Sequence, residues 1–158
     1  MIEPGFSNSS PATLLATWFG VGRLPGAPGT WGSLASLPLA WSLAAWAGPW
    51  GLAAGVATVF VAGIWAAGAY MRATGTDDPG AVVIDEVAGQ GLALLAVAPD
   101  PLLYLIGFAL FRLFDILKPW PVSWADREVG GGLGVMLDDM LAGLYAGAAL
   151  YGIAWGLA

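Results

Sequence analysis

Charged side chains are too rare in this chain to cover the surface of a water-soluble protein. Of its 158 residues, 10% are charged and 58% are hydrophobic, whereas soluble domains carry about 25% charged residues. Eleven acids against five bases give a net charge of −6. The sequence therefore predicts a membrane protein, with a single membrane-embedded domain over residues 1–158, because this length leaves no room for a separate soluble module.

The residue types that are missing exclude several kinds of chemistry. The chain contains no Cys, which excludes disulfides, thiolate nucleophiles and zinc ribbons. It also contains no His, the usual general base and a common metal ligand. There is no basic tract of the kind that binds a nucleic-acid backbone, so no nucleic-acid partner is expected. Ionic chemistry must come from carboxylates, Arg, Lys, hydroxyls and backbone groups.

A long uncharged segment predicts the first two membrane helices. Residues 24–71 form a run of 48 residues without a charge, whereas one membrane helix needs about 20 apolar residues. The dipeptide Gly48-Pro49 divides this run, since both residue types interrupt helices. The sequence thus predicts helices over residues 33–47 and 50–71, the first short enough to be tilted or re-entrant.

Three more apolar segments complete the predicted fold. We expect helices over residues 81–98, over residues 102–117, and from about residue 135 to the C-terminus, with a loop over residues 118–134. Residues 13–19 predict a short interfacial helix near the N-terminus. The expected fold class is all-α: a polytopic membrane helical bundle with about five hydrophobic helices.

The basic residues predict how this bundle is oriented. With five spans, Arg23, Arg72, Lys118 and Arg127 all fall in loops on one side, and the opposite turns contain no Lys or Arg. Because cytoplasmic loops carry the excess of Lys and Arg, these loops and the N-terminus are expected in the cytoplasm.

Ionisable groups on three predicted helices reach that same cytoplasmic end. They are Asp85, Glu86, Arg112, Asp115, Asp138 and Asp139. Asp and Arg inside membrane helices each cost about 2.5–3.5 kcal/mol on insertion scales. Four of the acids form two pairs of neighbouring residues, Asp85-Glu86 and Asp138-Asp139, and each pair is expected at the start of its helix. For any single residue, snorkelling, helix-end capping or a structural ion pair, such as Arg112 with Asp115 or Asp115 with Lys118, remains an alternative.

The two acidic pairs predict a site for a hard cation. Four carboxylates around a small space repel one another unless a cation neutralises them. Oxygen ligands without His or Cys favour Mg²⁺ over Mn²⁺ or Ca²⁺. The predicted ligands of one or two Mg²⁺ ions are Asp85, Glu86, Asp138 and Asp139. Arg112 and Lys118 beside such a cation indicate a bound anion, and phosphate is the natural one.

A glycine-rich turn over residues 25–33 has two interpretations. It could offer backbone N–H groups and the hydroxyls of Thr30 and Ser33 to a phosphate. Alternatively, Ser33 caps a helix that follows a Pro-Gly turn. The glycines between Gly130 and Gly134 have a similar ambiguity, since they permit close backbone approach or form a flexible loop.

Four motifs of glycine, proline and ionisable residues follow one another across residues 14–150. They are Gly20-x-Gly22-x₂-Pro25-x₂-Pro28-Gly29-Thr30-x-Gly32-Ser33-Leu34, Ile84-Asp85-Glu86-x₂-Gly89, Phe111-Arg112-x₂-Asp115-x₂-Lys118-Pro119-x-Pro121 and Gly131-Gly132-x-Gly134-x-Met136-x-Asp138-Asp139-x₂-Ala142-Gly143. In this order they resemble the phosphatidylglycerophosphatase A family. The resemblance implies a Mg²⁺-dependent enzyme of the bacterial inner (cytoplasmic) membrane. It would remove the terminal phosphate from the anionic phospholipid phosphatidylglycerophosphate, giving phosphatidylglycerol on the path to cardiolipin.

The resemblance and the residue chemistry together suggest roles for the motif residues. Arg112 and Lys118 would hold phosphate oxygens, while Asp115 would support the metal site or act as general base. Gly29, Thr30, Gly32 and Ser33 would bind substrate, and Arg127 would meet the glycerol or headgroup, with the acyl chains in the bilayer. A covalent aspartyl-phosphate on Asp85 or Asp138 is an alternative mechanism.

A different class of function also uses carboxylates inside membranes. A small ion- or proton-coupled transporter would employ the buried acids as a relay. Such a relay should reach the far side of the membrane, where the sequence offers only Asp100. A transferase of phospho-alcohols would also use Mg²⁺ and carboxylates, but its Asp-Gly-x₂-Ala-Arg motif is missing from this chain.

Overall fold

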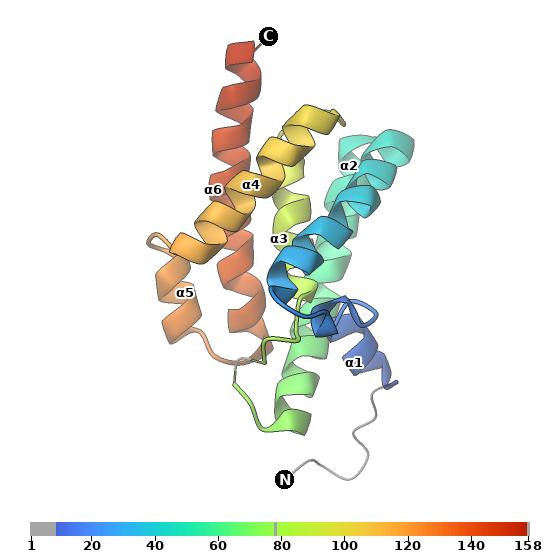
Figure 1. Ribbon diagram of the computed structural model, residues 1–158, viewed down its shortest axis with the longest axis vertical. Helices are drawn as coiled ribbons and strands as arrows, with labels where there is room; N and C mark the ends of the chain where they lie inside the picture. Colours follow the sequence, from blue (N-terminus) through green and yellow to red (C-terminus); the bar gives the residue numbers. More distant parts are fainter. Residues whose placement is uncertain (1–8, 78, 158) are drawn as a thin grey trace.

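The computed structural model describes residues 9–77 and 79–157, and the regular structure in this part of the chain is helical (Figure 1). In chain order the elements are α1 (Pro11–Ala16), the 3₁₀ helix η1 (Val21–Arg23), α2 (Pro28–Thr74), α3 (Ile84–Leu94), α4 (Pro101–Leu117), α5 (Val122–Glu128) and α6 (Gly131–Leu157). The prediction of an all-α fold is confirmed for the described residues.

Helix α2 is a helical hairpin. At Gly48 the backbone has φ 67° and ψ −170°, which breaks the helical path between its two halves. Glycine adopts such a conformation without the steric penalty of a Cβ, and the Pro49 that follows has no N–H to donate. In Figure 1 the chain rises along the first half and returns along the second. The predicted break at Gly48-Pro49 is confirmed, while the first helix begins at Pro28.

The short helix α3 forms the centre of the bundle. Eight of its 11 residues are buried, and it packs against α2, α4 and α6. Gly89 lets the backbone of α3 come close to that of α6. A Cβ added at this position would lie only 2.5 Å from the backbone carbonyl oxygen of Asp139. The backbones of α3 and α6 therefore meet at Asp139, which is one of the predicted site residues.

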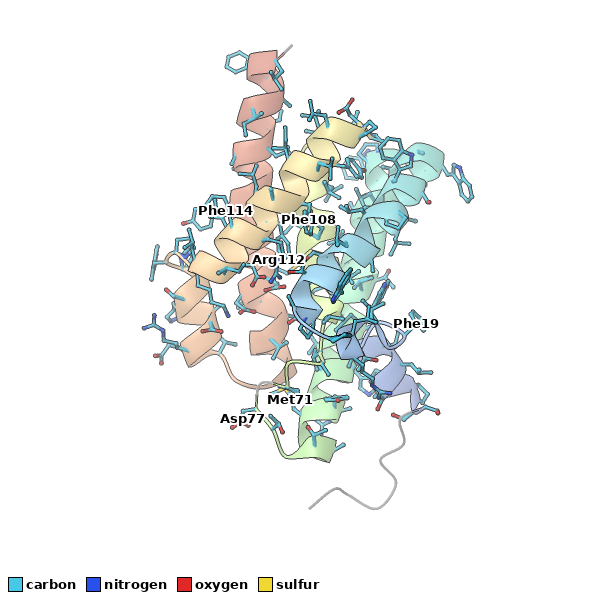
Figure 2. The ribbon with its side chains drawn as sticks, in the orientation of Figure 1. Phe19, Met71, Asp77, Phe108, Arg112 and Phe114 are labelled. Atoms are coloured by element: carbon cyan, nitrogen blue, oxygen red, sulfur yellow. The ribbon has the colours of Figure 1, made fainter. Side chains whose placement is uncertain are left out.

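Two of the described helices, α2 and α6, are long and apolar enough to cross a membrane. Helices α3 and α4 contain 11 and 17 residues, fewer than the about 20 of a typical full span. The prediction of about five spans is therefore not confirmed. Many apolar side chains project outward from the bundle (Figure 2). Among them Trp46 and Trp50 flank the α2 turn and are 91% and 85% exposed.

The segment before α6 differs from its predicted structure. Residues 118–134 were expected to form a loop, but they contain α5 and the first turn of α6. Asp138 and Asp139 accordingly lie about two turns inside α6, so the expectation that they open this helix is wrong. Glycine lowers helix propensity, but here it fits the packing. A Cβ at Gly132 would collide with the backbone carbonyl of Ile64 on α2.

A carboxylate-lined candidate active site

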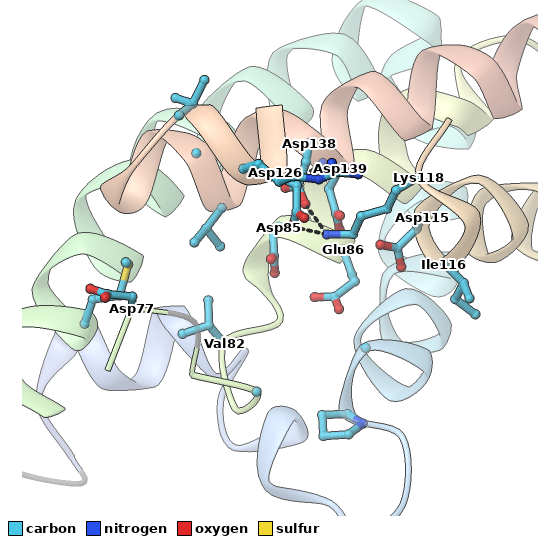
Figure 3. A pocket seen from close by; sticks show the side chains of 18 of the residues that line it. Asp77, Val82, Asp85, Glu86, Asp115, Ile116, Lys118, Asp126, Asp138 and Asp139 are labelled. Carbon is cyan, nitrogen blue, oxygen red and sulfur yellow. Dashed lines mark hydrogen bonds and ion pairs between the residues drawn. The ribbon is translucent and has the colours of Figure 1, made fainter. Parts of the chain in front are cut away.

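A cavity of about 870 Å³ opens where the ends of several helices meet (Figure 3). Its lining contains seven acidic and three basic side chains: Asp77, Asp85, Glu86, Asp115, Asp126, Asp138, Asp139, Arg112, Lys118 and Arg127. All six ionisable residues that the sequence placed at one end of the bundle lie around this cavity. The predicted convergence is therefore observed, while the chemical role of each residue stays a prediction.

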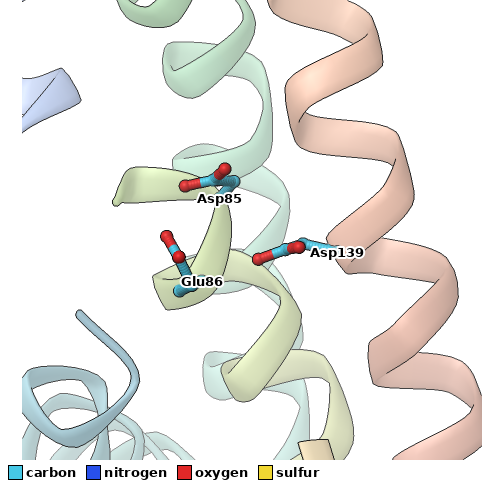
Figure 4. A group of neighbouring side chains, drawn as sticks. All are labelled: Asp85, Glu86 and Asp139. Carbon is cyan, nitrogen blue, oxygen red and sulfur yellow. The ribbon is translucent and has the colours of Figure 1, made fainter. Parts of the chain in front are cut away.

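Asp85, Glu86 and Asp139 form the tightest group of carboxylates, which we call the carboxylate trio (Figure 4). Each contributes one oxygen, and the three oxygens lie within 4.8 Å of one another. Asp85 Oδ1, Glu86 Oε2 and Asp139 Oδ2 are buried without a hydrogen-bond partner among the described residues. A buried acceptor left unsatisfied costs about 1–3 kcal/mol, and more if it is charged. The trio is thus an incomplete polar cluster whose donor set suits a hard cation.

Two local features of the chain build the trio. Asp85 and Glu86 lie in the first turn of α3, where free backbone N–H groups and the helix dipole favour negative charge. Asp139 comes from α6, and the absence of a side chain at Gly89 lets its backbone approach α3. Two carboxylates are therefore adjacent in sequence, and the third is added by helix packing.

Asp138 lies outside the trio and has its own partners. Its Oδ2 accepts a hydrogen bond from Lys118 Nζ at 2.8 Å, and its Oδ1 accepts one from the backbone N–H of Asp139 at 3.0 Å. Both carboxylate oxygens are therefore already satisfied. The assignment of Asp138 as a metal ligand stays a prediction. In the structure its carboxylate forms an ion pair with Lys118.

Arg112 joins α4 to the trio. Its Nη1 donates to Asp115 Oδ2, one helical turn away, and lies 3.8 Å from Glu86 Oε1. The Arg112 Nε is buried and has no hydrogen-bond acceptor among the described residues. The Arg112–Asp115 ion pair, one of the alternatives that the sequence allowed, is therefore present. It holds the guanidinium beside Glu86, a member of the trio, while the Nε–H has no acceptor among the described residues.

Lys118 connects three helices at the cavity (Figure 3). Its Nζ donates to Asp138 on α6 and to Asp126 Oδ1 on α5. Burial alone would lower the pKa of Lys118, but the hydrogen bonds and charges of Asp126 and Asp138 outweigh burial and raise this pKa above its usual value. The ammonium is therefore strongly held in its charged form.

Sequence reasoning did not include Asp126 among the site residues. Asp126 lies in the segment that was expected to be a loop, and its contact with Lys118 depends on α5 folding against α6. The available signal was weak: one more acid near Arg127 in a region already rich in charge.

Of the four predicted substrate-binding residues in the glycine-rich turn, one lines the cavity. Gly29 lines the cavity, and a Cβ there would lie 2.8 Å from Arg112 Nη1. Thr30, Gly32 and Ser33 are not part of the lining. The Ser33 hydroxyl is fully buried and donates to the Gly29 carbonyl at 2.9 Å. Because the helix begins at Pro28, the alternative that Ser33 is its N-cap is wrong.

The remaining predicted binding residue, Arg127, lies on α5 and lines the cavity with an exposed side chain. With Arg112 and Lys118, it is one of three basic side chains in a lining that also contains seven acids. The fold and the site thus define a class of protein: an all-helical bundle with membrane-length apolar helices, whose charged cavity contains a cluster of incompletely satisfied carboxylates.

Comparison with known proteins identifies the family within this class. A sequence model of phosphatidylglycerophosphatase A matches residues 14–154, so the chain belongs to the phosphatidylglycerophosphatase A family. The resemblance seen in the four motifs is confirmed, and the chain is an enzyme that hydrolyses a phosphate monoester.

Curated relatives cover most of the chain. Phosphatidylglycerophosphatase A of Escherichia coli (strain K12) is 39% identical over 145 residues, 90% of this chain and 83% of that protein. Phosphatidylglycerophosphatase A of Haemophilus influenzae is 37% identical over 145 residues, 91% of this chain and 89% of that protein. A putative phosphatidylinositol-3-phosphatase of Bacteroides thetaiotaomicron is 43% identical over 140 residues, 84% of this chain and 87% of that protein. No solved structure matches the chain significantly.

Proposed function

We propose that this protein hydrolyses the terminal phosphomonoester of phosphatidylglycerophosphate, releasing phosphatidylglycerol and inorganic phosphate, and that it depends on Mg²⁺. The observation that carries the proposal is the carboxylate trio, with three unsatisfied buried oxygens in a cavity that also contains Arg112 and Lys118. Two relatives with high coverage carry the name of this activity.

The trio supports Mg²⁺ binding through its chemistry and its size. All three donors are carboxylate oxygens, the ligands of a hard divalent cation. The three oxygens lie within 4.8 Å of one another, close enough for a single small cation to contact all three. The trio would therefore hold one ion. A second would require Asp138 to exchange its bond to Lys118 for the metal.

The other residues of the cavity have the chemistry that phosphate hydrolysis requires. When bound, Mg²⁺ supplies Lewis-acid stabilisation of the phosphate charge. The Arg112 guanidinium and the Lys118 ammonium, which both line the cavity, donate to non-bridging phosphate oxygens. Asp115, oriented by Arg112, accepts a proton from the attacking water.

As the water oxygen adds to phosphorus, the bond between phosphorus and the glycerol oxygen breaks. The glycerol oxygen then takes up the proton that Asp115 accepted from the water, and phosphatidylglycerol and inorganic phosphate leave. Arg127, on the exposed side of the cavity, contacts the glycerol or the headgroup. In the alternative mechanism, the carboxylate of Asp85 or Asp138 attacks phosphorus first and displaces the glycerol oxygen, which takes up a proton from Asp115. Water then hydrolyses the resulting aspartyl-phosphate and releases inorganic phosphate.

The proposed location is the bacterial inner membrane, with several spans and with the cavity facing the cytoplasm. Two membrane-length helices support this location, as do exposed Trp side chains at the α2 turn and near the end of α6. The acyl chains of the substrate would remain in the bilayer while the headgroup enters the charged cavity. The gathering of basic residues near that cavity supports its cytoplasmic orientation.

The distribution of charge favours hydrolysis over transport. The ionisable groups concentrate around one cavity, whereas a relay would continue through the bundle. Asp100, the acid nearest the other end, accepts a hydrogen bond from the Leu103 backbone N–H at 2.9 Å and caps α4. A transporter would instead catalyse ion flux in sealed vesicles without releasing phosphate.

The test is phosphate release from phosphatidylglycerophosphate by the purified protein in detergent. We expect release to stop with a chelator, to return with Mg²⁺, and to fall by at least about 100-fold in Asp85→Asn and Asp139→Asn. Glu128→Gln, which removes an exposed acid outside the cavity lining, is the matched control. Chelator-resistant release, or full activity in both folded Asn variants, would refute the proposal. Trapping of a phosphoenzyme would select the covalent route.

A further inference from the structure

Lys118 is the only lysine in the chain, and its backbone conformation is unusual. It ends α4 with φ 45° and ψ 58°, in the left-handed region, and its backbone N–H donates to the Phe114 carbonyl. Glycine is the usual residue at such a helix end because other residues are strained there. A residue held in a disfavoured conformation near a site points to a use for its side chain.

The Lys118 ammonium has two carboxylate partners. An ammonium group carries three N–H donors. One donates to Asp138 Oδ2 at 2.8 Å and a second donates to Asp126 Oδ1. The partners belong to α6 and α5, while Lys118 follows α4, so the ion-pair network joins three elements at the cavity. One donor remains for another acceptor.

The Asp126–Lys118 pair contributes little to folding. The side chains of Lys118 and Asp126 are 32% and 37% exposed, and ion pairs with this much solvent access add little stability. A long lysine side chain loses considerable rotamer freedom when it is fixed in one place. If its carboxylate partners restrict it beforehand, less freedom remains to be lost when an anion binds.

We propose that Asp126 is a positioning residue of the phosphatase reaction: with Asp138, it holds the Lys118 ammonium at the cavity so that the third N–H can donate to a substrate phosphate oxygen. This inference rests on the proposed function, because it assigns Lys118 to the phosphate. Asp126 itself does not touch the substrate. Its loss should therefore weaken substrate binding more than it slows the chemical step.

Kinetics of matched variants test this role. In Asp126→Asn, we expect the KM for phosphatidylglycerophosphate to rise about fivefold to tenfold while kcat stays within about twofold. Asp126→Glu retains the charge and should recover most of the KM. Glu128→Gln, on the same helix and outside the cavity lining, should behave as the unaltered protein. An unchanged KM in Asp126→Asn, or an equal loss in Glu128→Gln, would overturn the proposal.

A double-variant cycle separates positioning from a general effect of charge. If Asp126 acts through Lys118, Asp126→Asn should cause no further rise in KM in the Lys118→Met background. An additional rise of fivefold or more in that background would refute action through the lysine. Thermal unfolding in detergent accompanies each variant, and a lowered midpoint shared by Asp126→Asn and Asp126→Glu would instead identify a structural role.

A readout without catalysis keeps this inference separate from the proposed function. Because the chain has one lysine, acylation of its side-chain amine by a soluble reagent can be followed by peptide mass spectrometry. We expect acylation to be several-fold faster in Asp126→Asn and unchanged in Glu128→Gln. Equal rates in the folded proteins would show that Asp126 does not hold Lys118. Absence of Mg²⁺-dependent phosphate release from the unaltered protein would refute the proposed function alone.

Discussion

Replacing Gly89 by Ala tests whether the spacing of α3 and α6 controls Mg²⁺ binding at the proposed metal site. A Cβ at this position would lie 2.5 Å from the carbonyl oxygen of Asp139 and 2.7 Å from Cε2 of Phe111, whereas ordinary van der Waals contacts begin at 3.4 Å. Because protein interiors are close-packed and contain few voids, relief of this backbone contact requires α3 and α6 to separate locally by about 1 Å. The displaced backbone belongs to Asp139, a member of the carboxylate trio.

The magnitude follows from the size of the trio. Its three oxygens lie within 4.8 Å of one another, so the proposed ion would contact all of them only while α3 and α6 stay this close. Gly89→Ala moves Asp139 away from Asp85 and Glu86 and so separates one proposed ligand from the other two. Disturbing the support of metal ligands typically lowers metal affinity about 10–100-fold. We therefore expect the Mg²⁺ concentration for half-maximal activity to rise by about 10–100-fold, with a loss of about 1–3 kcal/mol in stability from overpacking.

The assay is phosphate release as a function of Mg²⁺ concentration, with unfolding followed in parallel. Gly147→Ala is the matched control, because it joins the same two helices and its Cβ would lie an ordinary 3.4 Å from the Ala93 carbonyl oxygen. This control should keep its Mg²⁺ dependence. A folded Gly89→Ala protein with an unaltered Mg²⁺ concentration for half-maximal activity would show that the spacing of α3 and α6 does not control Mg²⁺ binding. An equal rise in both variants would show the same.

Two further predictions test the site from other directions. Ser33→Ala should keep KM and kcat within about twofold, because the hydroxyl is buried and donates to the Gly29 carbonyl. Loss of this hydrogen bond should lower the free energy of unfolding by about 0.5–1.5 kcal/mol. A tenfold rise in KM would instead support direct substrate binding by Ser33. Mg²⁺ should raise the thermal unfolding temperature, since an ion present at 100 times its Kd stabilises the folded state by about 2.7 kcal/mol; an equal rise in Asp85→Asn would show that the ion binds elsewhere.

The predictable parts of the fold depended on strong local signals. The break at Gly48-Pro49 followed from two residues that interrupt helices, and the structure contains it. Asp85 and Glu86 were expected at the start of a helix, and they lie in the first turn of α3. Helix α5 was missed because seven residues give only weak periodicity, and its position depends on packing against α6.

The candidate site was predictable as a set of residues but not as a set of contacts. Scarce charges made the acids conspicuous, and their places along the helices brought them to one end of the bundle. The sequence predicted the same role, Mg²⁺ ligand, for Asp138 and Asp139. The structure places Asp139 in the trio and pairs Asp138 with Lys118, because neighbouring residues on a helix point about 100° apart.

The apolar character of the chain, its helical class, its family and its small group of ionisable residues could all be recognised from the amino-acid sequence. These properties depend on residue types and on spacing along the chain. The tertiary structure alone decided which carboxylates share a centre, which ones neutralise Arg112 and Lys118, and that Asp126 belongs beside the lysine. Such pairings depend on how closely α3, α4, α5 and α6 approach one another, and glycines such as Gly89 set that distance only after the helices have packed.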